Sequence, residues 1–243
     1  MSGLEVITIG VGDAFTARHF TTALLVRAEG FTLAIDCPDT YKRVLAASGV
    51  ATSEFGHVII THVHGDHMNG LEGYAYFKRF AEGTRLGLSV VPEVREVLWE
   101  KRLAASMGQL WDGAKMNDMR FEDYFEEKPL AWEVATSIGP FNVRVRRTIH
   151  HVPTSALLVE HDGETVGYSA DTAFDPELVA WLSQAHLIFH ETNYGPAHTP
   201  LTSLAGLSAE LRAKMRLVHY PDELDVETTN IACARQGERF HPT

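Results

Sequence analysis

Cysteine is almost absent from this 243-residue chain, which contains only Cys37 and Cys233. Two cysteines cannot build a disulfide framework, and their scarcity suits a reducing compartment, so we expect a cytoplasmic protein. Apolar runs are short as well. None approaches the length of about 18 residues that a membrane-spanning helix needs, so we expect no contact with a membrane. The N-terminal segment also lacks the basic and small-residue features of a secretion signal.

Basic residues are few relative to acidic ones. The 21 lysines and arginines face 32 aspartates and glutamates, which gives a net charge of −11. Proteins that bind long nucleic acids gain much of their affinity by neutralising phosphates with a basic surface. The charge therefore argues against long nucleic acid as a partner. Hydrophobic residues make up 45% of the sequence, and this length can bury one substantial core, so we expect a single domain over 1–243.

Strand-like and helix-like segments alternate along the chain. Apolar, β-branched runs bounded by turn residues predict strands at 4–10, 21–30, 31–36, 57–61, 130–136, 141–151, 155–162, 165–171, 186–191 and 216–220. Residues 71–128 have helical spacing and predict a helical, loop-rich insert that acts as a lid or a dimerisation surface. A C-terminal helix is expected after the last strand. Strand-rich halves with helices outside predict an α+β fold in which two mixed sheets pack together, an αββα sandwich.

The six residues from 62 to 67 carry the strongest chemical pattern. They read His-Val-His-Gly-Asp-His and follow the strand predicted at 57–61. In an extended segment residues i and i+2 point the same way, so His62 and His64 can bind one metal ion together. Asp66 and His67 follow a glycine turn and can bind a second. Imidazole and carboxylate ligands suit divalent zinc, manganese or iron, and we predict two such ions, with zinc preferred.

This segment resembles the HxHxDH signature of the metallo-β-lactamase superfamily. The order of the other motifs is similar to that family from about residue 6 to residue 220. The resemblance implies that Asp36, at the end of an early strand, orients the site without binding metal. It also implies the following ligands: His62, His64 and His150 for one ion, Asp66, His67 and His219 for the other, and Asp171 between them.

One ligand position has an alternative. His150 and His151 are adjacent at the end of a predicted strand, and neighbouring strand residues point to opposite faces, so only one of them can bind the metal. We prefer His150 because it precedes Asp171 by 21 residues, a spacing similar to that of the phosphodiesterase branch of the family.

The segment 186–200 indicates which reaction the site performs. His190-Glu191-Thr192 resembles the HEAT motif of ribonuclease Z-like phosphodiesterases, and His198-Thr199 resembles the HST motif that follows it. In that chemistry two metal ions share a hydroxide that attacks phosphorus. A histidine protonates the leaving alkoxide, a step typically worth about 10²–10⁴-fold in rate. The resemblance implies four catalytic residues: His198 as the general acid, Glu191 as its orienting partner, His190, and the metal-binding Asp66.

We therefore expect a metal-dependent phosphodiesterase that hydrolyses a cyclic nucleotide, a dinucleotide or a short oligonucleotide. Ribonuclease Z carries a long insertion that clamps transfer RNA between the ligands placed here at 150 and 171, and 21 residues leave no room for it. The alternatives are a ribonuclease Z-like RNA endonuclease, a thioesterase, lactonase or glyoxalase-like hydrolase that does not need His198, and a non-catalytic sensor. A homodimer is the default expectation for the oligomeric state.

Overall fold

Two mixed β-sheets form the centre of the molecule in a computed structural model that describes residues 3–242. The first sheet has the strand order β15-β1-β2-β3-β4-β5-β8. Its members are β1 (Glu5–Gly10), β2 (Ala23–Ala28), β3 (Phe31–Ile35), β4 (His57–Ile59), β5 (Leu86–Ser89), β8 (Phe125–Glu127) and β15 (Glu238–Phe240). Strands β3, β4, β5 and β8 run parallel, so the loops that follow β3 and β4 leave the sheet at the same edge.

The second sheet has the order β14-β13-β12-β11-β10-β9. Its members are β9 (Thr136–Ile138), β10 (Phe141–Arg147), β11 (Ser155–His161), β12 (Glu164–Tyr168), β13 (Leu187–Glu191) and β14 (Met215–Val218). The chain alternates direction from β9 to β12, and β12, β13 and β14 are parallel. The loops after these three parallel strands therefore share one edge of the second sheet.

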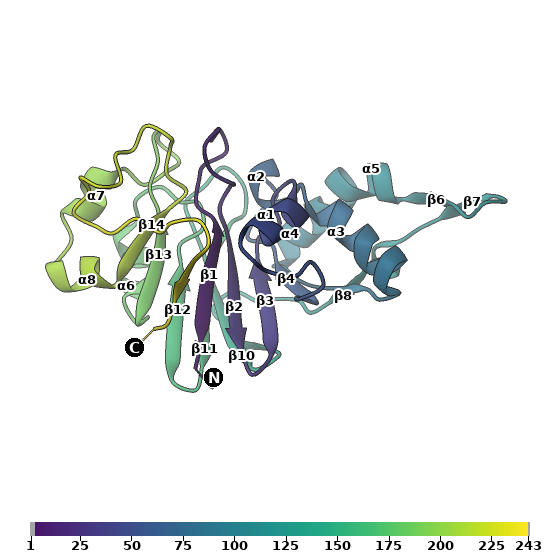
Figure 1. Cartoon of the computed structure of the whole chain (residues 1–243), viewed down its shortest axis with the longest axis horizontal. Helices are drawn as coiled ribbons and strands as arrows, with labels where there is room; N and C mark the ends of the chain where they lie inside the picture. The colour runs from purple at the N-terminus through teal and green to yellow at the C-terminus, as the bar shows by residue number, and fades with distance from the viewer. Residues whose placement is uncertain (1–2, 243) are drawn as a thin grey trace.

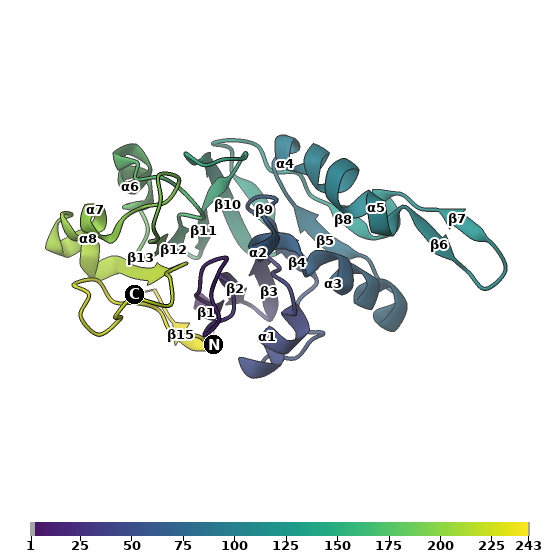
Figure 2. The same cartoon turned by 90° about the horizontal axis from the view of Figure 1, so that it is seen from above.

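Helices cover the outer sides of the two sheets (Figure 2). They are α1 (Tyr41–Ala47), α2 (Gly65–Met68), α3 (Leu71–Phe77), α4 (Pro92–Val97), α5 (Ala104–Met107), α6 (Pro176–Leu182), α7 (Leu201–Ala205) and α8 (Ala209–Lys214). Two π-helical segments, η1 (Lys78–Glu82) and η2 (Leu98–Leu103), continue α3 and α4, and η3 (Phe121–Asp123) is a short 3-10 helix. In Figure 2, α1 and α3 lie beside the first sheet and α6, α7 and α8 beside the second. This is the predicted αββα sandwich. Within residues 3–242 no helix has the length and apolar character needed to cross a bilayer.

The core lies between the sheets and follows from strand periodicity. In β10, Phe141, Val143 and Val145 are buried while Asn142 between them is exposed, because successive strand residues point to opposite faces. Val143 and Val145 pair with Val159 and Leu157 of β11. Burial of each such side chain contributes roughly 1.5–3 kcal/mol, so this face holds the second sheet against the first.

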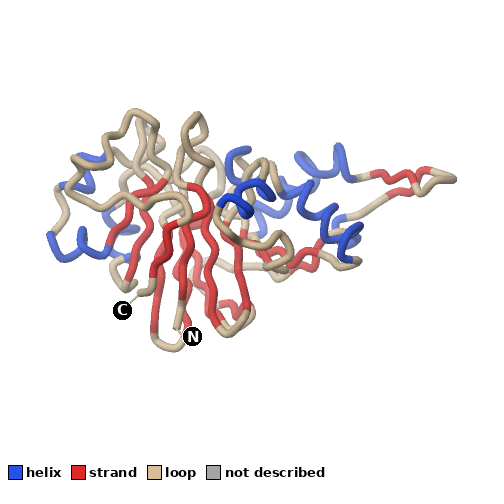
Figure 3. The backbone as a smooth tube through the Cα atoms, viewed as in Figure 1, coloured by secondary structure: helices blue, strands red, loops and turns tan. Residues whose placement is uncertain are grey.

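The segment 71–128 differs from the predicted helical insert. It contains α3, α4 and α5, but it also contributes β5 and β8 to the first sheet and a projecting hairpin of β6 (Gln109–Trp111) and β7 (Met116–Asp118). The run that forms β5 is short, apolar and buried throughout, and periodicity alone cannot separate such a strand from a helix. Figures 1 and 3 show the hairpin extending away from the sandwich.

The predicted C-terminal helix was also wrong. The only regular element after β14 in the described chain is β15, which pairs antiparallel with β1 and so closes the edge of the first sheet. Pairing with β1 across more than two hundred residues is a tertiary effect, and it overrides the weak local preference of the C-terminal sequence.

Candidate metal centre

The 62–67 segment lies in a loop at the edge of the first sheet, where β4 ends. His62 is fully buried, His64 is the N-cap residue of α2, and Asp66 and His67 lie in the short helix itself. Gly65, expected to form a turn between His64 and Asp66, is the first residue of α2. The His62 Nε2 and His64 Nδ1 atoms are 3.1 Å apart, so the two rings converge on one point.

The first cluster joins this loop to two loops of the second sheet. His62, His64, His150 and Asp171 each offer a ligand atom, and these atoms all lie within 4.8 Å of one another. The Oδ2 atom of Asp171 is 3.7 Å from His62 Nε2 and 3.6 Å from His150 Nε2. Three imidazoles and one carboxylate oxygen at such separations match a divalent transition-metal site.

The second cluster shares Asp171 with the first. Asp66, His67, Asp171 and His219 again place ligand atoms within 4.8 Å of one another. His67 Nε2 is 3.2 Å from Asp66 Oδ2 and 3.3 Å from Asp171 Oδ1, while His219 Nε2 is 3.3 Å from Asp66 Oδ2. Asp171 thus turns one oxygen to each cluster, which is the arrangement that a bridging ligand requires.

Two ligand atoms of the second cluster also lack hydrogen-bond partners in the described part of the chain. His67 Nε2 and Asp171 Oδ1 are buried and have no hydrogen-bond partner among the described residues. Buried polar groups are normally satisfied, and an orphaned imidazole nitrogen facing an orphaned carboxylate oxygen is costly unless a cation lies between them. The residues present therefore fit a divalent metal ion in the second cluster, and the three imidazoles and one carboxylate of the first cluster fit another.

Nearby charged groups lower the pKa of Asp171 and raise that of His67. Burial alone would raise the pKa of Asp171, but His219 and His67 hold it well below its usual range. Burial would lower the pKa of His67, yet Asp171 and Asp66 raise it well above the ordinary value. Burial lowers the pKa of His150 to about 4. The first cluster is therefore rich in neutral imidazole, while the second holds protons that a metal ion would displace.

Three residues of the site have left-handed backbone conformations that side chains other than glycine rarely adopt. Asp36 has φ of 65°, Ala170 has φ of 49° and His219 has φ of 55°. Such conformations cost of order 1–3 kcal/mol each and persist where the surrounding structure imposes them. Here they turn the chain at strand ends so that the carboxylate of Asp171, the ring of His219 and the carboxylate of Asp36 all face the centre.

Asp36 occupies the orienting position that the family resemblance implies. Its Oδ2 lies 2.8 Å from His67 Nδ1, and its Oδ1 accepts a hydrogen bond of 2.8 Å from the backbone N–H of Thr61. The Thr61 hydroxyl donates to the same carboxylate. Because Nδ1 of His67 is held by Asp36, its Nε2 is left for metal. Thr61, whose role the sequence analysis missed, fixes this arrangement; its place directly before the histidine motif is the only local signal.

Glu191 and His198 form a pair beside both clusters. His198 Nδ1 lies 3.0 Å from Glu191 Oε1, and the His198 side chain is 21% exposed while Glu191 is fully buried. Burial and the nearby Asp171 raise the pKa of Glu191 well above its usual range. The ring of His198 is 5.4 Å from those of His150 and His219. The structure therefore brings together the predicted acid, its partner and the metal ligands.

Two predicted positions lie outside this assembly. His190 neighbours Glu191 in β13 and so points to the opposite face, where its Nδ1 lies 2.8 Å from the Glu191 carbonyl oxygen. Burial lowers its pKa to about 4, so the ring is neutral. The structure does not bring it to the metal ligands, and its catalytic role stays a prediction. His151 is exposed, with its ring 6.2 Å from that of His64, and is absent from both clusters.

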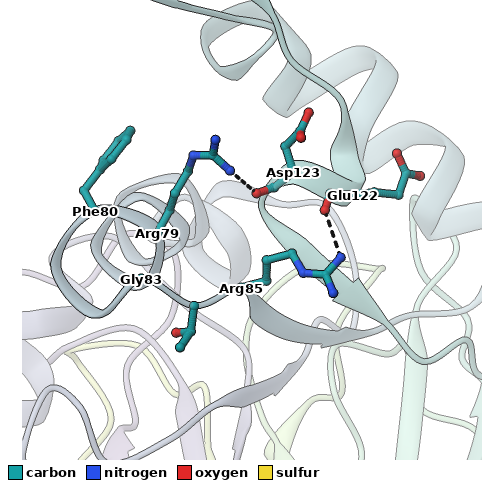
Figure 4. Close-up of a pocket in the computed structure, with 7 residues that line it drawn as sticks. Arg79, Phe80, Gly83, Arg85, Glu122 and Asp123 are labelled. Carbon is teal, nitrogen blue, oxygen red and sulfur yellow. Dashed lines mark hydrogen bonds between the residues drawn. The ribbon is translucent and has the colours of Figure 1, made fainter. Parts of the chain in front are cut away.

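A separate pocket of about 740 Å³ lies away from this chemistry (Figure 4). It is lined by Arg79, Phe80, Gly83, Thr84, Arg85, Glu122 and Asp123. Arg79 donates to the Asp123 carbonyl at 2.5 Å and Arg85 to the Glu122 carbonyl at 3.2 Å. Each guanidinium group thus donates to a backbone carbonyl of the protein itself, and none of the predicted metal ligands lines the pocket.

The αββα sandwich and its two clusters at the strand ends define a metallo-β-lactamase fold protein. Solved structures share the fold: YhfI from Bacillus subtilis, a metallo-β-lactamase fold protein, has a TM-score of 0.80 at 16% identity over 99% of this chain and 100% of its own. The short form of human tRNase Z has a TM-score of 0.73 at 18% identity, covering 98% and 99%.

The chain belongs to the Anti-Pycsar protein Apyc1 family, whose sequence profile matches residues 4–240. The Anti-Pycsar protein Apyc1 of Paenibacillus sp. (strain J14) is 33% identical over 247 aligned positions, which cover 98% of both chains. The similarity therefore extends over both sheets, both clusters and the segment 71–128.

Proposed function

We propose that this protein is a phosphodiesterase that hydrolyses a small phosphodiester with two divalent metal ions and His198 as general acid. The observation that carries the proposal is the position of His198 next to both clusters, held by the buried carboxylate of Glu191. A hydrolase acting on an ester or thioester needs no such acid. Cleavage of a P–O bond expels an alkoxide, which a positioned imidazolium can protonate.

Different residues of the chain would have different roles in the proposed reaction. When bound, divalent ions would lower the pKa of water and polarise the phosphoryl group. Asp171 spaces the two ion positions, and Asp36 fixes the ring of His67. Glu191 accepts the Thr172 N–H at 2.7 Å, which holds the carboxylate in place while it orients His198. His198, being partly exposed, can deliver a proton to a substrate oxygen and regain one from solvent.

A small substrate fits the rest of the molecule better than transfer RNA does. Between His150 and Asp171 the chain forms only β11, the Asp162–Gly163 turn and β12, where ribonuclease Z has its long insertion. The net charge of −11 also disfavours a long polyanion. The relatives are named for an action against Pycsar. Cyclic mononucleotides, cyclic dinucleotides and short oligonucleotides are the substrates we propose to test first.

The decisive experiment compares wild type with His198→Ala. We expect turnover of a cyclic nucleotide to fall about 10²–10⁴-fold while the bound metal, measured by mass spectrometry, stays unchanged. The loss should be smaller for bis-p-nitrophenyl phosphate, whose leaving group needs no proton. Assays should be run with zinc, manganese and iron(II), and with a thioester and a lactone beside the phosphodiesters. Faster turnover of the thioester or lactone, unaffected by the substitution, would overturn the proposal.

A further inference from the structure

A separate group of side chains that could hold a metal ion lies at the opposite edge of the sandwich from α2. Two hairpin turns meet there: the Glu29–Gly30 turn between β2 and β3 in the first sheet, and the Asp162–Gly163 turn between β11 and β12 in the second. Figure 1 shows these turns at the lower edge and α2 near the upper edge. Glu29, His161 and Asp162 place ligand atoms within 4.8 Å of one another.

His161 is the unusual member of this group. Its side chain points to the same, core-facing side of β11 as those of Leu157 and Val159, and only 4% of it is exposed. Its ring packs edge-on against Phe141, with the centroids 5.9 Å apart. A histidine at the end of an apolar face, packed on an aromatic ring, would be expected to have both nitrogens satisfied.

The Nδ1 atom of His161 has a hydrogen-bond partner, and its Nε2 atom has none among the described residues. Nδ1 lies 3.2 Å from the Pro140 carbonyl oxygen, which can only accept, so the proton is on Nδ1. Nε2 then carries a lone pair, and it is buried with no hydrogen-bond partner among the described residues. A ring N–H given to a backbone carbonyl, with the other nitrogen left free, is the usual state of a metal-binding histidine.

The free nitrogen faces two carboxylates. Asp162 Oδ2 is 3.7 Å and Glu29 Oε1 is 3.9 Å from His161 Nε2. Both distances are too long for a hydrogen bond, which would require about 2.7–3.2 Å. Ligands at about 2.0–2.1 Å around a tetrahedral zinc ion are about 3.3 Å apart. The two carboxylates are largely exposed, so small rotations of their side chains close the remaining gap.

We propose that Glu29, His161 and Asp162 bind a divalent transition-metal ion, separate from the two clusters of the metal centre. One nitrogen and two carboxylate oxygens, with water completing the coordination, suit zinc or manganese. The ion links the two sheets, because Glu29 belongs to the first sheet and His161 and Asp162 to the second. Its role is structural, since the site lies at the edge away from His198.

The test is a comparison of bound zinc. Wild type and the double variant Glu29→Gln, Asp162→Asn are saturated with zinc, and the ions per chain are measured by mass spectrometry at micromolar free zinc. We expect one ion fewer in the variant and at least tenfold weaker binding of that ion. Zinc added beyond saturation of the metal centre should also raise the Tm of wild type by several degrees and leave the variant's Tm unchanged. Both replacements keep the side-chain shape, and asparagine tolerates the left-handed backbone at 162.

Two further variants of the protein are measured in the same experiment. His161→Phe removes the nitrogen ligand while keeping a ring against Phe141, and it should lose the same ion. Glu96→Gln changes one exposed charge elsewhere and should retain it. Equal zinc content in wild type and the double variant, or an unchanged response of Tm to zinc, would overturn the proposal. The readout is a difference between matched proteins, so it does not depend on whether the protein is a phosphodiesterase.

Discussion

The metal centre buries polar atoms that lack hydrogen-bond partners in the described structure, whereas the 109–118 hairpin exposes apolar side chains to solvent. In the metal centre His62, His67, Asp171 and His219 are almost completely buried, and polar atoms face one another without partners. In the hairpin the reverse holds, because apolar side chains face solvent. Trp111 is 58% exposed, and Met116, its partner across the hairpin, is 55% exposed. The first region therefore fits cations, and for the second we propose an apolar partner surface.

The sharpest way to test this contrast is Asp171→Ala, which removes the only residue common to both clusters. Loss of a residue that merely supports a metal ligand costs about 10–100-fold in affinity or activity, so loss of the shared ligand should exceed a hundredfold in turnover. Metal content and kcat are measured together. Asp39→Asn removes an exposed charge of the same sign and should change neither.

Stability separates a ligand role for Asp171 from a structural one. If Asp171 mainly holds the fold, its replacement will lower the Tm by the same amount with and without metal. We expect a much larger difference in Tm with saturating zinc than without metal, where Asp171 contributes only its ion pairs with His67 and His219. Full metal content in Asp171→Ala would contradict the bridging position.

The second-largest expected effect is the dependence of metal affinity on pH. In the metal-free protein burial opposes the charged forms of His67 and His219, but Asp171 and Asp66 raise the pKa of both rings. Protons on them stabilise the metal-free protein at low pH, and this contribution disappears as pH rises through the raised pKa values. A metal ion must displace these protons, so affinity should increase with pH.

The slope of zinc affinity against pH can be measured. If both histidines release a proton, zinc affinity at the second cluster should change about a hundredfold per pH unit below their raised pKa values. Competition with a chelator across about pH 6 to 8, with calorimetry in buffers of different ionisation enthalpy, gives the slope and the proton count. Zinc binding without proton release would show that the two imidazoles are already neutral.

Asp36→Asn should have a smaller effect. An asparagine can keep its oxygen on the Thr61 N–H, but its amide then donates to His67 Nδ1 and forces that ring to protonate on Nε2, the atom needed for metal. We expect metal affinity at the second cluster to fall about 10–100-fold. Asparagine is compatible with the positive φ at 36, so the fold should persist. Unchanged affinity would mean that Asp36 only caps the loop.

Much of the metal centre was predictable because its chemistry is concentrated in one short segment. His62 to His67 lie within six residues at the end of an apolar strand, and strand periodicity indicates which side chains converge. The ligands from the second sheet are single residues at separate strand ends, and they came from the family resemblance. The same alternation explains His190, which the structure places on the far face of β13 because Glu191 faces the site.

Elements that depend on distant pairing were not predictable. β5 is an internal parallel strand of four residues, β8 is an edge parallel strand of three, and β15 is a three-residue edge strand whose strand partner in the described chain is β1. Their sequences carry no periodicity of their own. The sequence around His161 carries no pattern that marks it as a metal ligand. Its free nitrogen is visible only when β2–β3 and β11–β12 turns are placed together.

The smallest effect on chemistry should come from the hairpin. We propose that it forms part of a homodimer surface, since the exposed Trp111 and Met116 would then be buried. Tryptophan is enriched among the interface residues whose truncation costs more than about 1 kcal/mol, and about 1.4 kcal/mol corresponds to a tenfold change in the dissociation constant. Trp111→Ala should therefore weaken the dimer about tenfold, measured by sedimentation at several concentrations, with metal content unchanged. If the hairpin is instead a lid over the substrate, KM will rise in Trp111→Ala while its sedimentation matches wild type, and the contrast between a cation-dependent centre and a partner-dependent hairpin will not hold.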